Sequence, residues 1–177
     1  MAEPETDALY WYDPDPRAIL PLEQLHISRS LRRTLRQQPF EIRFDSAFAA
    51  LVELCAAPAP GREQTWLSSE LIALYVYLHA HGFAHSVECW QAGHLVGGVY
   101  GVSIGGFFAG ESMVSRARNS SKVALVHLVW RLRAQGYQLF DVQFQTPHLA
   151  RFGVCEIPRA DYHRRLAQAL PLPVQFL

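Results

Sequence analysis

The sequence predicts an α+β fold, a mixed sheet flanked by helices, from three observations. Residues 85–91, 95–104 and 107–113 read as strands separated by short turns, which is typical of an antiparallel meander. Residues 116–136 predict a helix that is apolar nearly all round from Val123 to Val129 and is therefore expected to be buried. Residues 137–144 predict another strand, and a strand, helix and strand in this order make a right-handed parallel crossover. Together they indicate a sheet of the acetyltransferase type (GNAT-type).

The other elements follow from helix caps, alternation and turn residues. Ser28 or Ser30 can begin one helix, and Ser68 or Ser69 can begin another that Gly82 ends. We expect helices over 28–38, 46–57, 68–82 and 160–170, and a strand over 40–45. Residues 11–21 hold three prolines and are expected to be extended or turned, whereas 57–64 and 146–153 are expected to be loops.

Length and composition indicate one globular domain. The chain has 177 residues, of which 50% are hydrophobic and 18% charged, and its formal net charge is zero. We expect residues 1–9 to form a disordered acidic tail and residues 10–177 to form a single acetyltransferase-like domain, and we expect the chain to be a monomer. No signal peptide opens the chain and no apolar run is long enough to span a membrane, so a cytoplasmic location without membrane contact is expected.

The cysteines and histidines do not predict a metal site. Cys55, Cys89 and Cys155 are odd in number and lack CxxC spacing, which argues against a disulfide framework and against zinc. The one dense histidine group, HAHGFAH at 79–85, lies where a helix is expected to end. We therefore expect no metal and no cofactor.

Two features could serve an anionic partner. Fifteen of the 16 basic residues are arginine, which suits bidentate phosphate contacts. Asn119, Ser120 and Ser121 stand at the start of the buried helix beside Lys122, and a helix N-terminus can hold a phosphate. Each has an ordinary explanation, a GC-rich genome for the arginines and helix capping for the polar cluster, and the sequence leaves both open.

Polar residues within apolar strands mark a candidate site. Asp141 and Gln143 are two residues apart in a predicted strand, so we expect both side chains on one face, opposite Phe140, Val142 and Phe144. They form either a polar site or a pair that satisfies itself. Glu111, at the end of the preceding strand, could join them. No Ser, Cys or His arrangement resembles a nucleophile with its base, so direct transfer is favoured over a covalent intermediate.

Residues 95–113 hold six glycines although they read as two strands. Glycine weakens a strand interior, so it usually marks a bulge or a place where another group approaches the backbone. The stretch therefore predicts an irregular strand pair that ends near Glu111.

Long strings in the chain carry a family resemblance. They are WYDPDPRAILPLEQLHISRSLRR (11–33), TWL (65–67), HSVECW (85–90), LVGGVYGVSIGGFFAGESMVSRARNSSKVAL (95–125), DVQFQTPHLARFGVCEIPR (141–159) and DYH (161–163). On these strings the chain resembles the leucyl/phenylalanyl-tRNA–protein transferase family. The resemblance implies an aminoacyltransferase that moves Leu or Phe, with Met as a further possibility, from aminoacyl-tRNA to the N-terminal Arg or Lys of a protein. The product is a degradation signal in the bacterial N-degron pathway.

The resemblance also implies roles for single residues. Asp141 orients and polarises Gln143 beside the attacking amine, and Glu111 with Ser112 binds the acceptor. The glycines let the peptide and the aminoacyl ester approach the strands. The donor side chain is expected in a dry pocket of apolar residues: Val99, Phe108, Met113, Leu128, Leu132 and Phe140. The tRNA is expected on aromatic and basic residues: Trp66, Tyr75, Arg29, Arg33 and Arg36. Read without the family, the six apolar residues are simply core, Trp66 a buried anchor and the arginines a solvated face.

The chain departs from the family at its front and at two single positions. Longer members carry an N-terminal domain before the WYDPDPR segment, and we expect this chain to be a short form without it. Val114 stands where Phe is usual, and Pro147 where Asp often precedes the His. Two other functions remain open: a truncated paralogue that binds tRNA or N-terminal Arg or Lys peptides without catalysis, and an acyl-CoA-dependent N-acetyltransferase. The second needs a glycine-rich loop before the buried helix, where RARNSSK (116–122) has no glycine.

Overall fold

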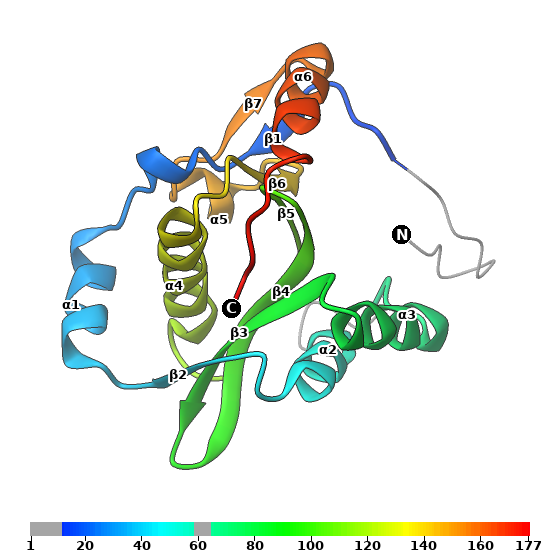
Figure 1. Ribbon diagram of the computed structural model, residues 1–177. Helices are drawn as coiled ribbons and strands as arrows, with labels where there is room; N and C mark the ends of the chain where they lie inside the picture. The colour runs from blue at the N-terminus through cyan, green and yellow to red at the C-terminus, as the bar shows by residue number, and fades with distance from the viewer. Residues whose placement is uncertain (1–11, 59–64) are drawn as a thin grey trace.

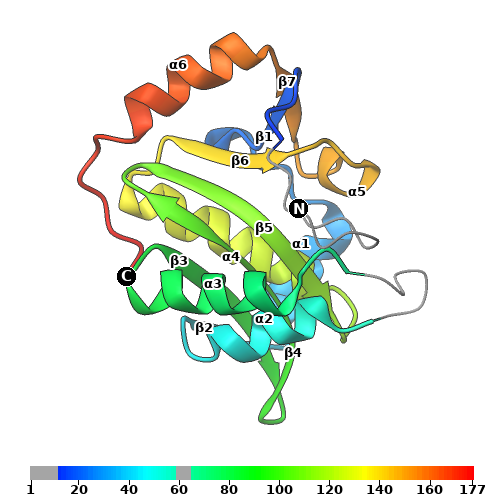
Figure 2. The ribbon, with the colours of Figure 1, turned by 90° about the vertical axis from the view of Figure 1, so that its right-hand side faces the viewer.

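The computed structural model describes residues 12–58 and 65–177, which form a mixed sheet with helices on both faces (Figures 1 and 2). Within these residues the sheet has seven strands in the order β2-β3-β4-β5-β6-β1-β7. The strands are β1 (Arg17–Ile19), β2 (Glu41–Phe44), β3 (Ala84–Gln91), β4 (His94–Ile104), β5 (Phe107–Ser115), β6 (Leu139–Gln143) and β7 (Cys155–Ile157). The helices are the 3-10 helix η1 (Leu22–Gln24), α1 (Arg29–Gln37), α2 (Phe48–Ala56), α3 (Ser69–Ala80), α4 (Ser120–Gln135), α5 (Pro147–Ala150) and α6 (Arg159–Ala169).

The expected meander and crossover are both present. β3 pairs antiparallel with β4, and β4 pairs antiparallel with β5. After the crossover through α4, β6 pairs in parallel with β5. Nine of the sixteen α4 residues are buried, which agrees with a helix that is apolar on nearly all sides. The prediction of an α+β mixed sheet is therefore confirmed.

Three apolar clusters hold the helices on the sheet. The largest joins α4 and α1 to one face and includes Phe108, Leu128 and Phe140. On the opposite face α2 and α3 pack around Phe48, and α6 packs through Tyr162 on the β5–β6 end. Figure 2 shows α2 and α3 in front of the sheet and α4 behind it. Burial of apolar surface on both faces is the main favourable term in such a fold.

Some expected boundaries are wrong. The helix predicted from residue 116 begins at Ser120, and the predicted loop 146–153 contains the short helix α5. The proline-rich segment supplies β1, which pairs antiparallel with both β6 and β7. Three-residue strands such as β1 and β7 are too short to carry an alternating pattern. The acidic tail expected at residues 1–9 lies outside the described residues, as does most of the 57–64 loop.

Most glycines of the 95–113 stretch make room for protein atoms. A Cβ on Gly97 would meet the Ser120 side chain, and a Cβ on Gly98 would meet the Leu51 side chain. A Cβ on Gly101 would meet the Ala109 carbonyl oxygen. The expectation that these glycines admit substrate is therefore wrong at those positions, which are filled by packing.

Candidate active site

The candidate site lies where the neighbouring strands β5 and β6 part. Their parallel pairing covers three residue pairs and ends at Ala109 with Asp141. Beyond that point, residues of both strands line a cavity of about 260 Å³. Its lining consists of Val99, Gly110, Glu111, Ser112, Met113, Leu125, Phe140, Val142, Gln143, Thr146, His148 and Leu149. The site is thus an apolar hollow with a carboxylate and a carboxamide on its wall.

A bulge in β5 places Glu111 at this cavity. Tyr100 of β4 pairs with Ser112 and Gly101 pairs with Gly110, so Glu111 between them has no partner on β4. An extra residue of this kind turns the strand and re-aims its side chains. Consequently Phe108 and Met113 both pack toward α4 although they are five residues apart. Regular alternation would have put them on opposite faces.

Glu111 is held by an aromatic neighbour. The Tyr75 hydroxyl of α3 donates a hydrogen bond of 2.9 Å to Glu111 Oε2. Burial raises the pKa of Glu111; the bond from Tyr75 opposes this shift, and the nearby charge of Asp141 adds to it. The carboxylate therefore gains from a cation that enters the cavity.

The Tyr75 ring continues into an aromatic group that includes Trp66. The Trp66 and Tyr75 ring centroids are 6.4 Å apart in an edge-to-face arrangement, and Tyr100 lies 5.2 Å from Tyr75. Trp66 is half-buried, whereas Tyr75 is buried and its hydroxyl is bound to Glu111. The structure thus brings Trp66 and Tyr75, which were expected to contact the adenosine, close to Glu111, which was expected to bind the acceptor.

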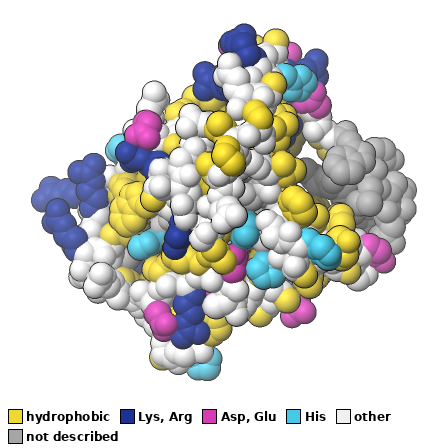
Figure 3. Space-filling view, in the orientation of Figure 1, with side chains coloured by type: hydrophobic (Ala, Val, Ile, Leu, Met, Phe, Trp, Pro, Cys, Tyr) yellow, Lys and Arg dark blue, Asp and Glu magenta, His cyan; other side chains and the backbone are white. Residues whose placement is uncertain are grey.

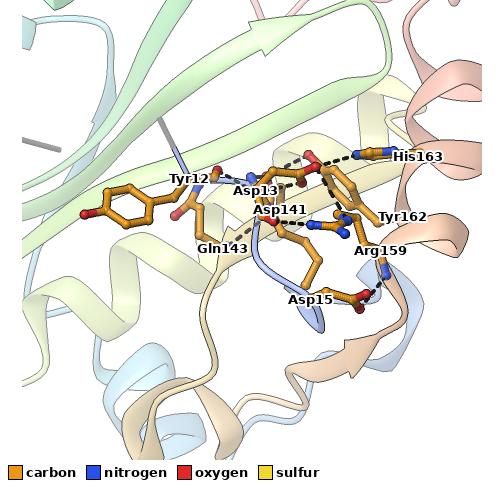
Figure 4. Close-up of polar contacts among 9 residues, drawn as sticks. Tyr12, Asp13, Asp15, Asp141, Gln143, Arg159, Tyr162 and His163 are labelled. Atoms are coloured by element: carbon orange, nitrogen blue, oxygen red, sulfur yellow. Dashed lines mark hydrogen bonds and ion pairs between the residues drawn. The ribbon is translucent and has the colours of Figure 1, made fainter. Parts of the chain in front are cut away.

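Asp141 is not among the residues that line the cavity, and Figure 4 shows the polar contacts of its carboxylate. Its side chain is fully buried. Arg17 of β1 donates to both carboxylate oxygens, from Nε at 3.0 Å and from Nη2 at 2.6 Å. The Tyr162 hydroxyl of α6 donates at 2.9 Å. The fourth donor is the backbone N–H of Gln143, also at 2.9 Å. Asp141 therefore contacts the main chain of Gln143, and no hydrogen bond joins it to the carboxamide in the described structure.

Gln143 does not share the face of Asp141, so that expectation is wrong. The backbone of Gln143 is left-handed, with φ of 58°, and β6 ends there. Its side chain lines the cavity together with Phe140 and Val142, which alternation had placed on the opposite face. Alternation assumes an extended backbone, and a residue with positive φ breaks it.

The residues expected around the donor side chain divide into two sets. Val99, Met113 and Phe140 line the cavity. Phe108, Leu128 and Leu132 are core residues with exposures of 0%, 1% and 0%, and they do not line it. All three face α4 or belong to it, and a helix that is apolar all round gives no signal of which residues reach a cavity.

Sequence reasoning missed several wall residues. Leu125, Val142, Thr146, His148 and Leu149 also line the cavity. The last three come from α5 and the residue before it, a segment expected to be an unstructured loop. The Thr146 hydroxyl caps this helix by accepting from the Leu149 N–H, so a Thr-Pro start was the available signal. His148 Nε2 is buried without a hydrogen-bond partner.

Arginines gather on α1, which lies at the left of Figure 1, where Figure 3 shows a group of Lys and Arg side chains. Arg29, Arg33 and Arg36, with Arg32 beside them, are exposed. Among the residues that the structure describes, none of these side chains forms an ion pair with an acid. They present an unneutralised positive surface.

The start of α4 is occupied by internal contacts. The Ser120 hydroxyl lies 2.8 Å from the Val96 carbonyl oxygen and 2.9 Å from the Ala117 carbonyl oxygen, and its single proton bonds to one of them. Asn119 has a left-handed backbone and its amide donates to Thr34 Oγ1, so it does not cap the helix with its side chain. Both observations favour an architectural role for this polar cluster over phosphate binding.

In the part of the chain that the structure describes, no group of three or more His, Cys, Asp or Glu side chains could hold a metal ion. None of the described helices is both long enough and apolar enough to cross a membrane.

Known proteins resemble the chain over most of its length. Residues 19–167 match the protein-family model for leucyl/phenylalanyl-tRNA protein transferase. The chain is 58% identical over 173 residues to the leucyl/phenylalanyl-tRNA–protein transferase of Herpetosiphon aurantiacus, covering 97% of this chain and 88% of that one. It is 56% identical over 177 residues to the enzyme of the same name from Phenylobacterium zucineum, covering 99% and 80%.

A solved structure, "The structure of L-PGS from Bacillus licheniformis", superposes with a TM-score of 0.51. The alignment has 16% sequence identity and covers 76% of this chain and 49% of that one. At this identity the likeness concerns the fold alone, and it agrees with the predicted acetyltransferase-type sheet.

Proposed function

The chain belongs to the leucyl/phenylalanyl-tRNA–protein transferase family, and we propose that it transfers Leu or Phe from aminoacyl-tRNA to the N-terminal Arg or Lys of a protein. The observation that carries the proposal is the cavity between β5 and β6. It offers an apolar wall for the donor side chain and the Glu111 carboxylate for a cationic acceptor, with the Gln143 side chain on the same wall. Both substrates of such a transfer can therefore meet in one place.

The donor side chain occupies the apolar part of the cavity. Its volume of about 260 Å³ lies just below the range of roughly 300–1,000 Å³ that holds drug-sized ligands. This space suits one large side chain and not a whole aminoacyl nucleotide. Met113 on the wall is unbranched and adapts its shape, which supports acceptance of both Leu and Phe.

The acceptor binds through its positive charge. Glu111 is the one acidic side chain on the wall among the described residues, and burial strengthens its interaction with a cation that replaces water there. The side chain of an N-terminal Arg or Lys places its charge at Glu111, and Ser112 beside it offers a hydroxyl. The α-amine then lies near Gln143.

The reaction is direct aminolysis of an ester. The α-amine nitrogen forms a bond to the ester carbonyl carbon, and the bond from that carbon to the ribose oxygen breaks. The proton lost by the amine finishes on the ribose hydroxyl, directly or through water. A carboxamide is a poor base, so Gln143 acts by positioning the amine and stabilising the polar transition state.

The tRNA body is held by charge and its terminal adenosine by stacking. Arg29, Arg33 and Arg36 form the exposed positive surface on α1, and such contacts position a nucleic acid without reading its sequence. Half-buried Trp66 offers the more accessible ring for the adenosine, because Tyr75 is buried and bound to Glu111.

A transfer assay tests the proposal. The protein is mixed with labelled Phe-tRNA or Leu-tRNA and a peptide that starts with Arg; a Gly-starting peptide and a Gln143→Ala variant run beside it. We expect label on the Arg peptide alone, reduced strongly in the variant. Binding of tRNA or Arg peptide without transfer would instead identify a binding module. Acyl transfer to the peptide in a parallel reaction, in which acyl-CoA replaces the aminoacyl-tRNA, would identify an N-acetyltransferase.

A further inference from the structure

The Asp141 carboxylate has no free hydrogen-bonding capacity. An ionised carboxylate offers about four lone-pair positions. Oδ1 accepts from Arg17 Nε and from the Gln143 N–H, and Oδ2 accepts from Arg17 Nη2 and the Tyr162 hydroxyl. The side chain is fully buried and lies off the cavity wall. Substrate, water and the Gln143 carboxamide therefore find no remaining acceptor site on it.

We propose that Arg17 and Tyr162 are positioning residues that saturate Asp141, so that Asp141 fixes the backbone of Gln143 and takes no part in moving a proton. This inference rests on the proposed transfer reaction, for which it names the residues that shape the site. It separates the Asp-x-Gln pair into a buried clamp, Asp141, and a cavity-facing group, Gln143.

The bond from the Gln143 N–H to Asp141 Oδ1 supports an uncommon backbone shape. A left-handed conformation is sparsely populated for a residue other than glycine, and it persists where the surroundings impose it. An Asp side chain that accepts from the backbone two residues later is a local way to impose such a turn. The same turn directs the Gln143 side chain to the cavity, so the clamp sets the direction of the group that meets the amine.

Arg17 and Tyr162 are suited to this task. The planar guanidinium matches the carboxylate with two parallel bonds, a geometry that lysine cannot copy. The Arg17 guanidinium also lies 4.7 Å from the Tyr162 ring centroid. Burial by itself lowers the pKa of Arg17, but the hydrogen bonds and charge of Asp141 outweigh it and the pKa is raised. Burial and the neighbouring Asp141 raise the pKa of Tyr162, so its hydroxyl remains a donor.

An outer group of charges ties the clamp to two elements (Figure 4). Arg159 and His163 of α6 both contact Asp13, at 3.8 and 3.2 Å, and Asp13 also lies 3.8 Å from Arg17. Asp13, which precedes β1, thereby links α6 to Arg17 of β1, and Arg17 in turn is bound to Asp141 of β6. This gives a functional reason for β1, a three-residue strand at the far side of β6.

Steady-state kinetics of conservative variants tests the proposal. Arg17→Lys keeps the charge and loses the two-point contact, and it is expected to lower kcat about 10- to 100-fold. Tyr162→Phe removes one bond and is expected to lower kcat about 3- to 10-fold. KM values for Phe-tRNA and the Arg peptide stay within about threefold of wild type, since neither residue binds substrate. Arg164→Lys, an exposed change on the same helix, is the control and is expected to be silent.

The pH profile of kcat distinguishes a clamp from a proton acceptor. Asp141→Asn is expected to lower kcat and to leave the shape of the profile unchanged. Loss of the acidic limb of the profile in this variant would overturn the proposal, because Asp141 would then be titrating in the reaction. Wild-type kcat in Arg17→Lys would overturn it as well.

Hydrogen exchange provides a readout that needs no transfer and so separates this proposal from the proposed function. In Arg17→Lys and Asp141→Ala the Gln143 amide is expected to exchange about tenfold faster or more. The Leu20 amide, which donates to the Phe140 carbonyl at 2.9 Å, reports on the same β1–β6 edge and should keep its rate. Equal acceleration of both amides would show a loosened sheet and contradict a specific clamp. Unchanged exchange at Gln143 would contradict it too.

Discussion

Replacing Glu111 with Gln is expected to remove the preference for a positively charged acceptor. The substitution keeps the size of the side chain and its place in the β5 bulge, and it removes only the charge. A hydrogen bond to a charged group contributes about 1.5–3 kcal/mol, which corresponds to roughly 10- to 150-fold in kcat/KM at about 1.4 kcal/mol per tenfold. The Coulomb attraction of two unit charges 4 Å apart is about 4 kcal/mol at an effective dielectric constant of about 20, and the cost of removing both charges from water keeps the net gain below that figure.

The assay compares two peptides that differ in one group. One starts with Arg and the other with citrulline, which has nearly the same shape without the charge. We expect wild-type protein to prefer Arg by about 10- to 150-fold and Glu111→Gln to show a ratio near one. Tyr75→Phe removes the bond to Oε2 but keeps the charge, so it should retain most of the preference. Glu53→Gln, an exposed carboxylate on α2, serves as the control.

The pH dependence gives a second check on the same residue. Burial raises the pKa of Glu111, so on acidification it is protonated before an ordinary carboxyl group. Since only the ionised form attracts the acceptor, the Arg preference should fall as pH decreases through this raised pKa and recover as pH rises. A preference that survives in Glu111→Gln would refute the assignment of Glu111 as the acceptor-binding charge.

Three further outcomes are expected. Gly101→Ala should unfold the protein or cost at least about 3 kcal/mol in urea titrations, because the added Cβ meets the Ala109 carbonyl oxygen and cannot be relieved. Burial lowers the pKa of His127 from its ordinary 6.5, so the unfolded chain binds more protons below about pH 6.5; the free energy of unfolding should fall there on acidification, and less steeply in His127→Gln. Val99→Phe narrows the cavity and should reduce kcat/KM for Phe-tRNA about tenfold more than for Leu-tRNA, whereas equal losses would place the donor elsewhere.

Regular features of the fold could be predicted from the sequence because they repeat over many residues. The β3–β5 meander spans three strand-like runs separated by short turns, and α3 carries a Ser68 cap whose hydroxyl accepts from the Leu71 N–H as expected. Short or irregular features could not be predicted. β1 and β7 have three residues each and gain their stability from partners distant in sequence, which no local pattern records.

The candidate site shows the same division. Asp141 and Glu111 stand out as carboxylates within apolar strands, and this pattern is enough to mark both as site candidates. Their neighbours could not be placed, because alternation assumes regular strands and fails at the Glu111 bulge and at Gln143. The role of Arg17 was also hidden, since it is 124 residues from Asp141 along the chain.

The two irregularities explain the site together. The bulge at Glu111 and the left-handed turn at Gln143 lie just beyond the last β5–β6 pair, Ala109 with Asp141. Each takes its strand out of the regular ladder, so the strands part and a cavity opens between them. Each also directs a polar side chain to that cavity. The opening and the polar groups therefore have one cause, and a change that restored a regular strand at either position should both narrow the cavity and turn its polar group away.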